Sequence, residues 1–284
     1  FAERTRYHNA DDVKHCHKFR PDTDEEFHRI LTWHFTRQFD QSKLSNRHKA
    51  RTLELLTKLA GGWLAFTALT GLRPEEPAFL FRCEPLTQPP AKPSILPPGT
   101  IFPDRDGVIW MKIVRTKHGQ NPFVHVHVVL ADFLKSWGAW LDGQPEFKTE
   151  ADLARPLFPS PTAPDKCFCP VTTNVKGVVE VDTTAINKRL DQCCTELKLD
   201  RRKPKGVGRA FYVAVRRSAG KDDAAIATEL GQTTNGELIR TTYGDPDDLR
   251  GGSLFDWLPD APIKCAWTGL PTVAKSNVVK VAFK

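Results

Sequence analysis

The pattern of apolar residues predicts two helices in the first quarter of the chain. Residues 23–26, Thr-Asp-Glu-Glu, form a capping box, and apolar positions at helical spacing follow it, which predicts a helix over about 24–38. A second helical pattern covers about 48–69 and ends at a Thr-Gly pair. Gly61 and Gly62 weaken this helix in isolation, so we expect tight packing against a neighbour to hold it.

The middle of the chain carries loop and strand patterns. Six prolines between Glu84 and Gly99 exclude regular structure there and indicate an extended surface loop. Strand patterns cover residues 108–114 and 123–128, and the polar TKHGQNP between them predicts a β-hairpin. Residues 142–182 are rich in loop-forming residues, so we expect little regular structure in them.

Helical patterns dominate the rest of the chain. An amphipathic helix is expected over 131–141, and we interpret its Trp137 and Trp140 as core residues rather than as a platform on which bases stack. Further helices are predicted around 186–197 and over 208–219, 223–230 and 235–242. Gly220 and Gly231 are their natural stops.

Composition narrows the class of protein. The 284 residues include 41 Lys and Arg against 34 Asp and Glu, for a net charge of +7, which favours an anionic partner such as nucleic acid. No apolar run approaches the length of a membrane span, and the first residues do not resemble a signal peptide, so we expect a cytoplasmic protein. Seven cysteines form no CxxC pair, which argues against a zinc ribbon or a disulfide framework.

Four separated residues suit one kind of chemistry. Arg73 follows a Gly-Leu break, Lys117 lies in the predicted hairpin turn, Arg209 opens a later helix, and Tyr243 precedes a Gly-Asp-Pro turn. A tyrosine hydroxyl attacks a phosphodiester, two guanidinium groups hold its non-bridging oxygens, and an ammonium group protonates the leaving oxygen. Such a site needs no metal and no cofactor.

These residues lie in motifs that resemble those of the tyrosine recombinases, the phage integrase family. TGLRPEE matches the first arginine box through Arg73, with Glu76 as its acidic residue, and TKHG matches the hairpin lysine through Lys117. The second box is matched from Arg209 to Ala219-Gly220, the Leu-Gly-His motif aligns with Leu230-Gly231-Gln232, and the terminal tyrosine aligns with Tyr243. The resemblance covers roughly residues 24–246, with the motifs in the family's order.

The resemblance implies a fold, a set of partners and a reaction. The fold would be α+β and mainly α-helical, with a small antiparallel sheet that carries the lysine hairpin. Residues 23–250 would form the catalytic domain, preceded over 1–22 by a linker or the remnant of a DNA-clamping domain and followed by a tail over 251–284. The partner would be double-stranded DNA, bound as a homo-tetramer on two sites, with a monomer or weak oligomer in its absence. The source would be bacterial or phage-derived.

The implied roles fall on named residues. Tyr243 would form a 3′-phosphotyrosyl link, Arg73 and Arg209 would stabilise the transition state, and Lys117 would act as the general acid. Gln232 stands where the family has histidine or tryptophan, and it donates a hydrogen bond without carrying charge. The candidates for contacts with DNA phosphates are the four cations of the RRKPK run and the histidine beside Lys117: Arg201, Arg202, Lys203, Lys205 and His118.

Two departures from the family leave alternatives open: Gln232 is one, and the other lies just before the second arginine. Three residues before Arg209 the family has histidine or lysine, and this chain has Gly206, with Lys205 as the neighbouring cation. A DNA-binding protein of the same fold with impaired catalysis is therefore one alternative. A type IB topoisomerase-like enzyme, which uses similar chemistry without partner sites, is another. The plainest alternative treats Arg73, Arg209 and Tyr243 as ordinary structural residues that do not converge.

Overall fold

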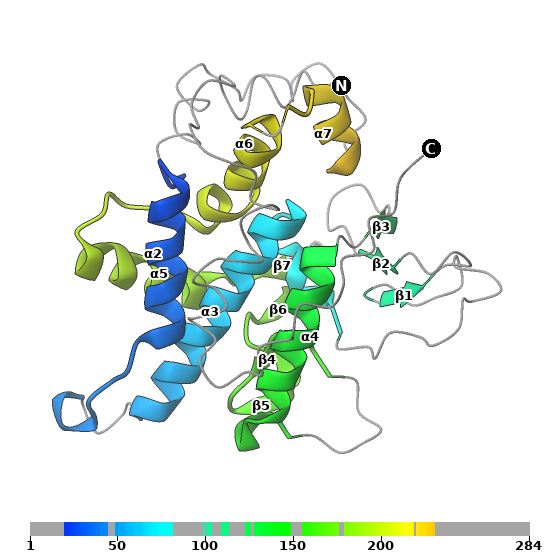
Figure 1. The fold of residues 1–284 in the computed structure, drawn as a ribbon. Helices are drawn as coiled ribbons and strands as arrows, with labels where there is room; N and C mark the ends of the chain where they lie inside the picture. The colour runs from blue at the N-terminus through cyan, green and yellow to red at the C-terminus, as the bar shows by residue number, and fades with distance from the viewer. Residues whose placement is uncertain are drawn as a thin grey trace.

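A computed structural model describes the fold over residues 20–44, 49–81, 99, 101–103, 109–113, 123–125, 128–148, 155–175, 179–218 and 220–230. This part of the chain is mainly helical, with small antiparallel sheets, which confirms the α+β class (Figure 1). The predicted proline-rich loop, the hairpin turn, the helix over 235–242 and the tail over 251–284 lie outside the described residues.

Helix α2 (Asp24–Thr36) begins where the capping box predicts. The Thr23 hydroxyl accepts a hydrogen bond from the Glu26 backbone N–H at 3.1 Å. In a standard capping box the Glu26 carboxylate would reach back to the N–H of Thr23, but here it accepts from the N–H of Asp22 at 2.9 Å. The box therefore closes one residue earlier than expected.

Helix α3 (Ala50–Thr70) is the centre of the molecule. It contacts α2, α4 (Val128–Asp142) and α5 (Thr184–Leu197), and Figure 1 shows it running between α2 and α4. A Cβ on Gly61 would lie 2.6 Å from Cβ of His34 in α2, and one on Gly62 would lie 2.5 Å from the Trp137 ring in α4. The expectation that close packing holds this glycine-containing helix is confirmed.

The core is aromatic and lies on both sides of α3. Trp63 and Phe66 of α3 are fully buried, as are Trp137 of α4 and Phe158. The Phe158 ring centroid lies 4.9 Å from that of Trp63 and 5.4 Å from that of Trp137. Trp140 packs against the same cluster, at 4.7 Å from Trp137. Trp137 is therefore a core residue, as predicted, and Trp140 is partly buried against the same core.

The predicted β-hairpin is present and has a third strand. Strand β2 (Ile109–Lys112) pairs antiparallel with β3 (Phe123–His125) in the register Met111 to Val124. Strand β1 (Ile101–Pro103) adds to the other edge of β2, which gives the order β1-β2-β3. Two further two-stranded sheets lie within the segment that we predicted to be loop-rich: β4 (Pro159–Ser160) with β5 (Ala163–Cys167), and β6 (Val171–Thr173) with β7 (Val179–Val181).

Short elements complete the described fold. Three are 3₁₀ turns: η1 (Gln41–Lys43), η2 (Glu76–Phe79) and η4 (Pro145–Phe147). After α5 the chain forms a π-helical turn, η5 (Gly206–Ala210), which continues into α6 (Phe211–Ser218) and is followed by α7 (Asp223–Glu229). Gly220, with φ of 78°, separates the last two helices, as predicted. The four cysteines of the described part are free thiols, three of them buried.

Candidate functional site

The first arginine box lies at the C-terminal end of α3. The helix ends at Gly71, whose φ of 66° is in the left-handed region that favours glycine. Arg73 comes two residues later, and its backbone N–H donates to Oε2 of the fully buried Glu76 at 2.8 Å. The indole N–H of Trp63 donates to the Pro74 carbonyl at 3.0 Å. The buried Glu76 carboxylate and the core residue Trp63 thus fix the backbone at Arg73 and at the residue that follows it.

The Arg73 side chain is partly buried, and no hydrogen bond of its guanidinium group occurs within the described residues. Its Nη1 atom is shielded from solvent and has no hydrogen-bond partner. A buried guanidinium nitrogen without an acceptor is costly, because the lost hydration is not replaced. An anion would supply the acceptor if the Arg73 side chain turned so that this nitrogen became accessible.

The second arginine box lies on the π-helical turn. Arg209 is 2% exposed, and its Nη1 donates to the Gly71 carbonyl at 3.1 Å. Gly208 allows the turn to approach α3, because a Cβ there would lie 2.8 Å from Cβ of Thr67. Turns of π-helix are rare and occur often at functional sites. The sequence pattern predicts an ordinary helix start here and gives no signal for the wider turn.

The two arginine boxes therefore meet at one end of α3. Arg209 binds the carbonyl of Gly71. Arg73 is two residues from that glycine along the chain, so the Cα atoms of Arg73 and Gly71 lie within about 7 Å of each other. Leu230 lies against the same glycine, since a Cβ on Gly71 would collide with its Cδ2 atom and with the Tyr212 ring, at 2.7 Å from Cδ1. The first box, the second box and the start of the Leu-Gly-Gln motif are thus brought together.

Helix α7 is held against α6 by partly buried polar contacts that the sequence analysis missed. The Tyr212 hydroxyl donates to Oε2 of Glu229 at 2.8 Å, and Arg216 donates to the same carboxylate from Nε at 2.9 Å and from Nη2. Burial raises the pKa of Tyr212, and the Glu229 charge raises it further. The only sequence signal for these contacts is the i,i+4 spacing of Tyr212 and Arg216, which puts both side chains on one face of the helix.

The RRKPK run alternates between exposed and buried side chains. Arg201, Lys203 and Lys205 are exposed, whereas Arg202 and Pro204 between them are buried. The first three residues have no regular structure, and a helical turn begins at Lys203, whose carbonyl accepts from the Gly206 N–H at 2.9 Å. Three of the four cations in the run are thus accessible to a DNA backbone.

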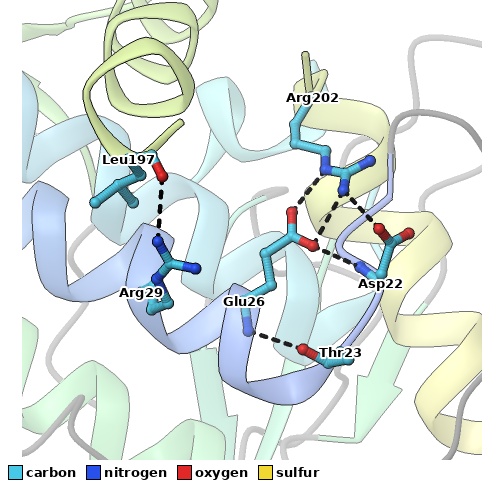
Figure 2. A network of polar contacts seen from close by, with 6 residues as sticks. All are labelled: Asp22, Thr23, Glu26, Arg29, Leu197 and Arg202. Carbon is cyan, nitrogen blue, oxygen red and sulfur yellow. Dashed lines mark hydrogen bonds and ion pairs between the residues drawn. The ribbon is translucent and has the colours of Figure 1, made fainter. Parts of the chain in front are cut away.

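Arg202 does not belong to the accessible set. Its side chain is 4% exposed, and its Nε donates to Oε1 of Glu26 at 2.7 Å while Nη2 reaches Asp22 at 3.0 Å (Figure 2). We therefore withdraw the expectation that Arg202 contacts DNA. It joins the chain before η5 to the N-terminus of α2, where a bidentate ion pair gives it a structural role.

A groove of about 630 Å³ lies beside the first arginine box. Pro74 and Glu75 line one side, Lys203 and Lys205 line another, and Val181 of β7 contributes to the wall. Lys205, the cation next to Gly206, thus lines the same groove as the two residues that follow Arg73. Gly206 itself is buried in the π-helical turn.

The remaining predicted site residues fall outside the part of the chain that the structure describes: Lys117, His118, Gln232 and Tyr243. In the described ranges, no three His, Cys, Asp or Glu side chains are grouped to hold a metal ion. None of the helices there has the length and apolar character to cross a bilayer.

No model of a known protein family matches the sequence, and a search of curated proteins finds no significant relative.

Proposed function

We propose that this protein is a tyrosine recombinase-like enzyme that breaks and rejoins DNA through a 3′-phosphotyrosyl intermediate at Tyr243. In this proposal the described residues form the catalytic-domain fold of that family. Arg73 and Arg209 hold the scissile phosphate, Lys117 protonates the departing 5′ oxygen, and Gln232 donates a hydrogen bond to a phosphate oxygen. The phosphodiester energy is kept in the tyrosyl ester, so rejoining needs no nucleotide cofactor.

The observation that carries the proposal is the hydrogen bond from Arg209 to the Gly71 carbonyl. It supports a single site, because it joins two motifs that are far apart in the sequence. The arginines of both motifs are expected to act at one phosphate. The solvent-shielded Nη1 of Arg73 supports the same proposal, since an anion there would provide its acceptor. The plainest alternative treats these arginines as unrelated structural residues, and the contact of Arg209 with the glycine two residues before Arg73 favours a shared site over it.

The proposal is tested by trapping the covalent adduct. The protein is incubated with nicked duplexes of randomised sequence, in which the cleaved strand diffuses away, and complexes that survive SDS are counted and their DNA is sequenced. We expect an adduct in the unmodified protein and none in Tyr243→Phe. Tyr212→Phe is the matched control, because it removes a hydroxyl that already binds Glu229.

Replacement of Arg73 tests whether its guanidinium group contributes to the rate of adduct formation. Arg73→Gln is expected to lower the rate of adduct formation by about 100-fold or more, since one donor to a developing charge is lost. Arg51→Gln, at the opposite end of α3, is the control and should keep the rate. An adduct that persists in Tyr243→Phe overturns the proposal.

Two other outcomes identify the alternatives. DNA binding without any adduct would point to the impaired DNA-binding protein, for which Gly206 and Gln232 are the motivating residues. Relaxation of supercoiled plasmids that share no sequence would point to the topoisomerase-like enzyme.

A further inference from the structure

A second pocket lies at the other end of α3 from the arginine boxes. Its volume is about 450 Å³, and it is bounded by the segment after α2, the first turns of α3 and one face of α5. Phe39, Leu44 and Leu53 contribute apolar surface, and Arg189 and Gln192 of α5 contribute polar groups. Because α3 has 21 residues, this pocket is about 30 Å from Gly71 along the helix axis.

Arg189 is the unusual residue of this pocket. It is partly buried, and it has no hydrogen bond or ion pair among the described residues, whereas neighbouring cations have such partners. Burial lowers its pKa, and no carboxylate opposes that shift. Its charge also helps to lower the pKa of the fully buried His34.

The other charges that line the pocket compensate one another. Arg37 pairs with Glu196 at 3.1 Å, and its guanidinium carbon lies 5.3 Å from the centre of the Phe39 ring. Lys43 lies 3.7 Å from Asp40. The pocket therefore keeps one uncompensated positive charge, that of Arg189.

We propose that this pocket binds an organic monocarboxylate through Arg189. The Arg189 guanidinium group is partly buried and has no partner among the described residues, and an anionic ligand would supply one. The planar guanidinium group matches a carboxylate in a two-point hydrogen bond. One net charge fits a monoanion better than a phosphate dianion, and Phe39, Leu44 and Leu53 provide an apolar wall for the body of the ligand. The volume is within the usual range for small-molecule sites, about 300–1,000 Å³.

The proposal is independent of DNA cleavage, because its residues lie at the opposite end of α3 and include none of the arginine boxes. Isothermal titration calorimetry with benzoate on the full chain tests it. Benzamide, the neutral analogue of the same shape, and inorganic phosphate are titrated in parallel. We expect benzoate to bind at least about ten-fold more tightly than benzamide, as charge-assisted hydrogen bonding to Arg189 requires.

The variant Arg189→Gln is expected to weaken benzoate binding by about ten-fold or more and to leave benzamide binding unchanged. Arg201→Gln is the matched control, because Arg201 is exposed outside the pocket and pairs with Asp191. A thermal melt of Arg189→Gln without ligand is expected to give an unchanged or raised Tm, since an uncompensated charge is removed.

Three outcomes would overturn the proposal. Equal affinity for benzoate and benzamide would remove the role of charge. Equal benzoate affinity in Arg189→Gln and the unmodified protein would place the ligand elsewhere. Phosphate that binds more tightly than benzoate would show a phosphate site instead.

Discussion

Gly208 shows how a single residue positions the candidate site. Its lack of a side chain lets η5 lie against Thr67 of α3, and this contact brings Arg209 to the Gly71 carbonyl. The Thr67 hydroxyl donates to the carbonyls of Trp63 and Leu64, each at 3.0 Å, so its side chain is not free to move aside. The position of Arg209 therefore depends on the absence of a methyl group at Gly208.

The variant Gly208→Ala should disturb this contact. Its Cβ would lie 2.8 Å from Cβ of Thr67, so we expect a loss of about 1–3 kcal/mol in the free energy of unfolding and a lower rate of adduct formation. Urea denaturation measures the first effect. Gly143→Ala is the control, because its Cβ would meet nothing closer than 3.4 Å. Equal stability of the two variants would contradict the prediction.

His34 makes stability depend on pH. Burial lowers its pKa to about 4 from 6.5, and the Arg189 charge adds to this against the opposing hydrogen bond to the Ile30 carbonyl. The unfolded chain binds the proton first, so stability is full above about pH 6.5 and falls as the pH drops toward 4. The expected loss from this residue is about 2 kcal/mol by pH 5.

The measurement is urea denaturation between pH 7 and pH 5. His34→Asn, which keeps a nitrogen near the position of Nδ1, should lose less stability over this range than the unmodified protein. His28, whose pKa is also lowered by burial, titrates in both proteins and cancels in the comparison. Parallel pH profiles for the two proteins would show that His34 is not responsible.

At the scale of elements, a buried ion pair joins α2 to the chain before η5. Glu26 binds Arg202 through both oxygens and also accepts the N–H of Asp22, so one carboxylate contributes to the helix start and to the contact with the distant segment (Figure 2). Asp22, the other partner of Arg202, has a side chain that is 73% exposed. The two acidic residues therefore contribute unequally.

We expect Glu26→Gln to lower the free energy of unfolding by about 3 kcal/mol or more, because it leaves the charge of Arg202 buried with a weaker partner. Asp22→Asn removes an exposed partner of the same guanidinium and should cost about 1 kcal/mol or less. Urea denaturation of both variants at pH 7 measures the two losses in the free energy of unfolding. A larger effect of Asp22→Asn would show that the buried pair is not the principal contact.

The helices could be predicted from the sequence because each has a local signal. The capping box marks α2, the Thr-Gly pair marks the end of α3, and Asp222 caps α7 by accepting the Ala225 N–H at 2.7 Å. The pairs β4 with β5 and β6 with β7 were missed because their strands have two to five residues, too few for a periodic pattern. Strand β1 was missed because it precedes its partner β2 directly after a proline-rich stretch that suggested only loop.

The candidate site could be predicted only in part. The arginines were found from the order of their motifs, but the π-helical turn depends on the contact of Gly208 with Thr67, which no local pattern encodes. The exclusion of Arg202 depends on its ion pairs with Glu26 and Asp22 near the start of α2, and RRKPK does not show which of its cations faces the core.

For the whole molecule, the net charge of +7 matters less than where the cations lie. Lys203 and Lys205 line the groove beside Pro74 and Glu75, next to the first arginine box. Lys148, after α4, and Lys166, in β5, are also exposed. Figure 1 shows β5 beside the lower part of α4, away from α6 and α7. The two pairs of lysines carry equal charge. Replacing one pair or the other therefore distinguishes a local contact with DNA from a general electrostatic attraction.

The salt dependence of DNA binding distinguishes these two effects. Each phosphate contact releases counterions and contributes about 0.9 to the slope of log K against log salt concentration. If Lys203 and Lys205 each neutralise a phosphate, the double variant Lys203→Gln/Lys205→Gln should reduce the slope by about 2, whereas Lys148→Gln/Lys166→Gln should leave it nearly unchanged. Fluorescence anisotropy with a labelled duplex over a series of salt concentrations gives both slopes. Equal reductions in the two variants would mean that the net charge, rather than the groove, attracts the DNA, because both variants lose the same two charges.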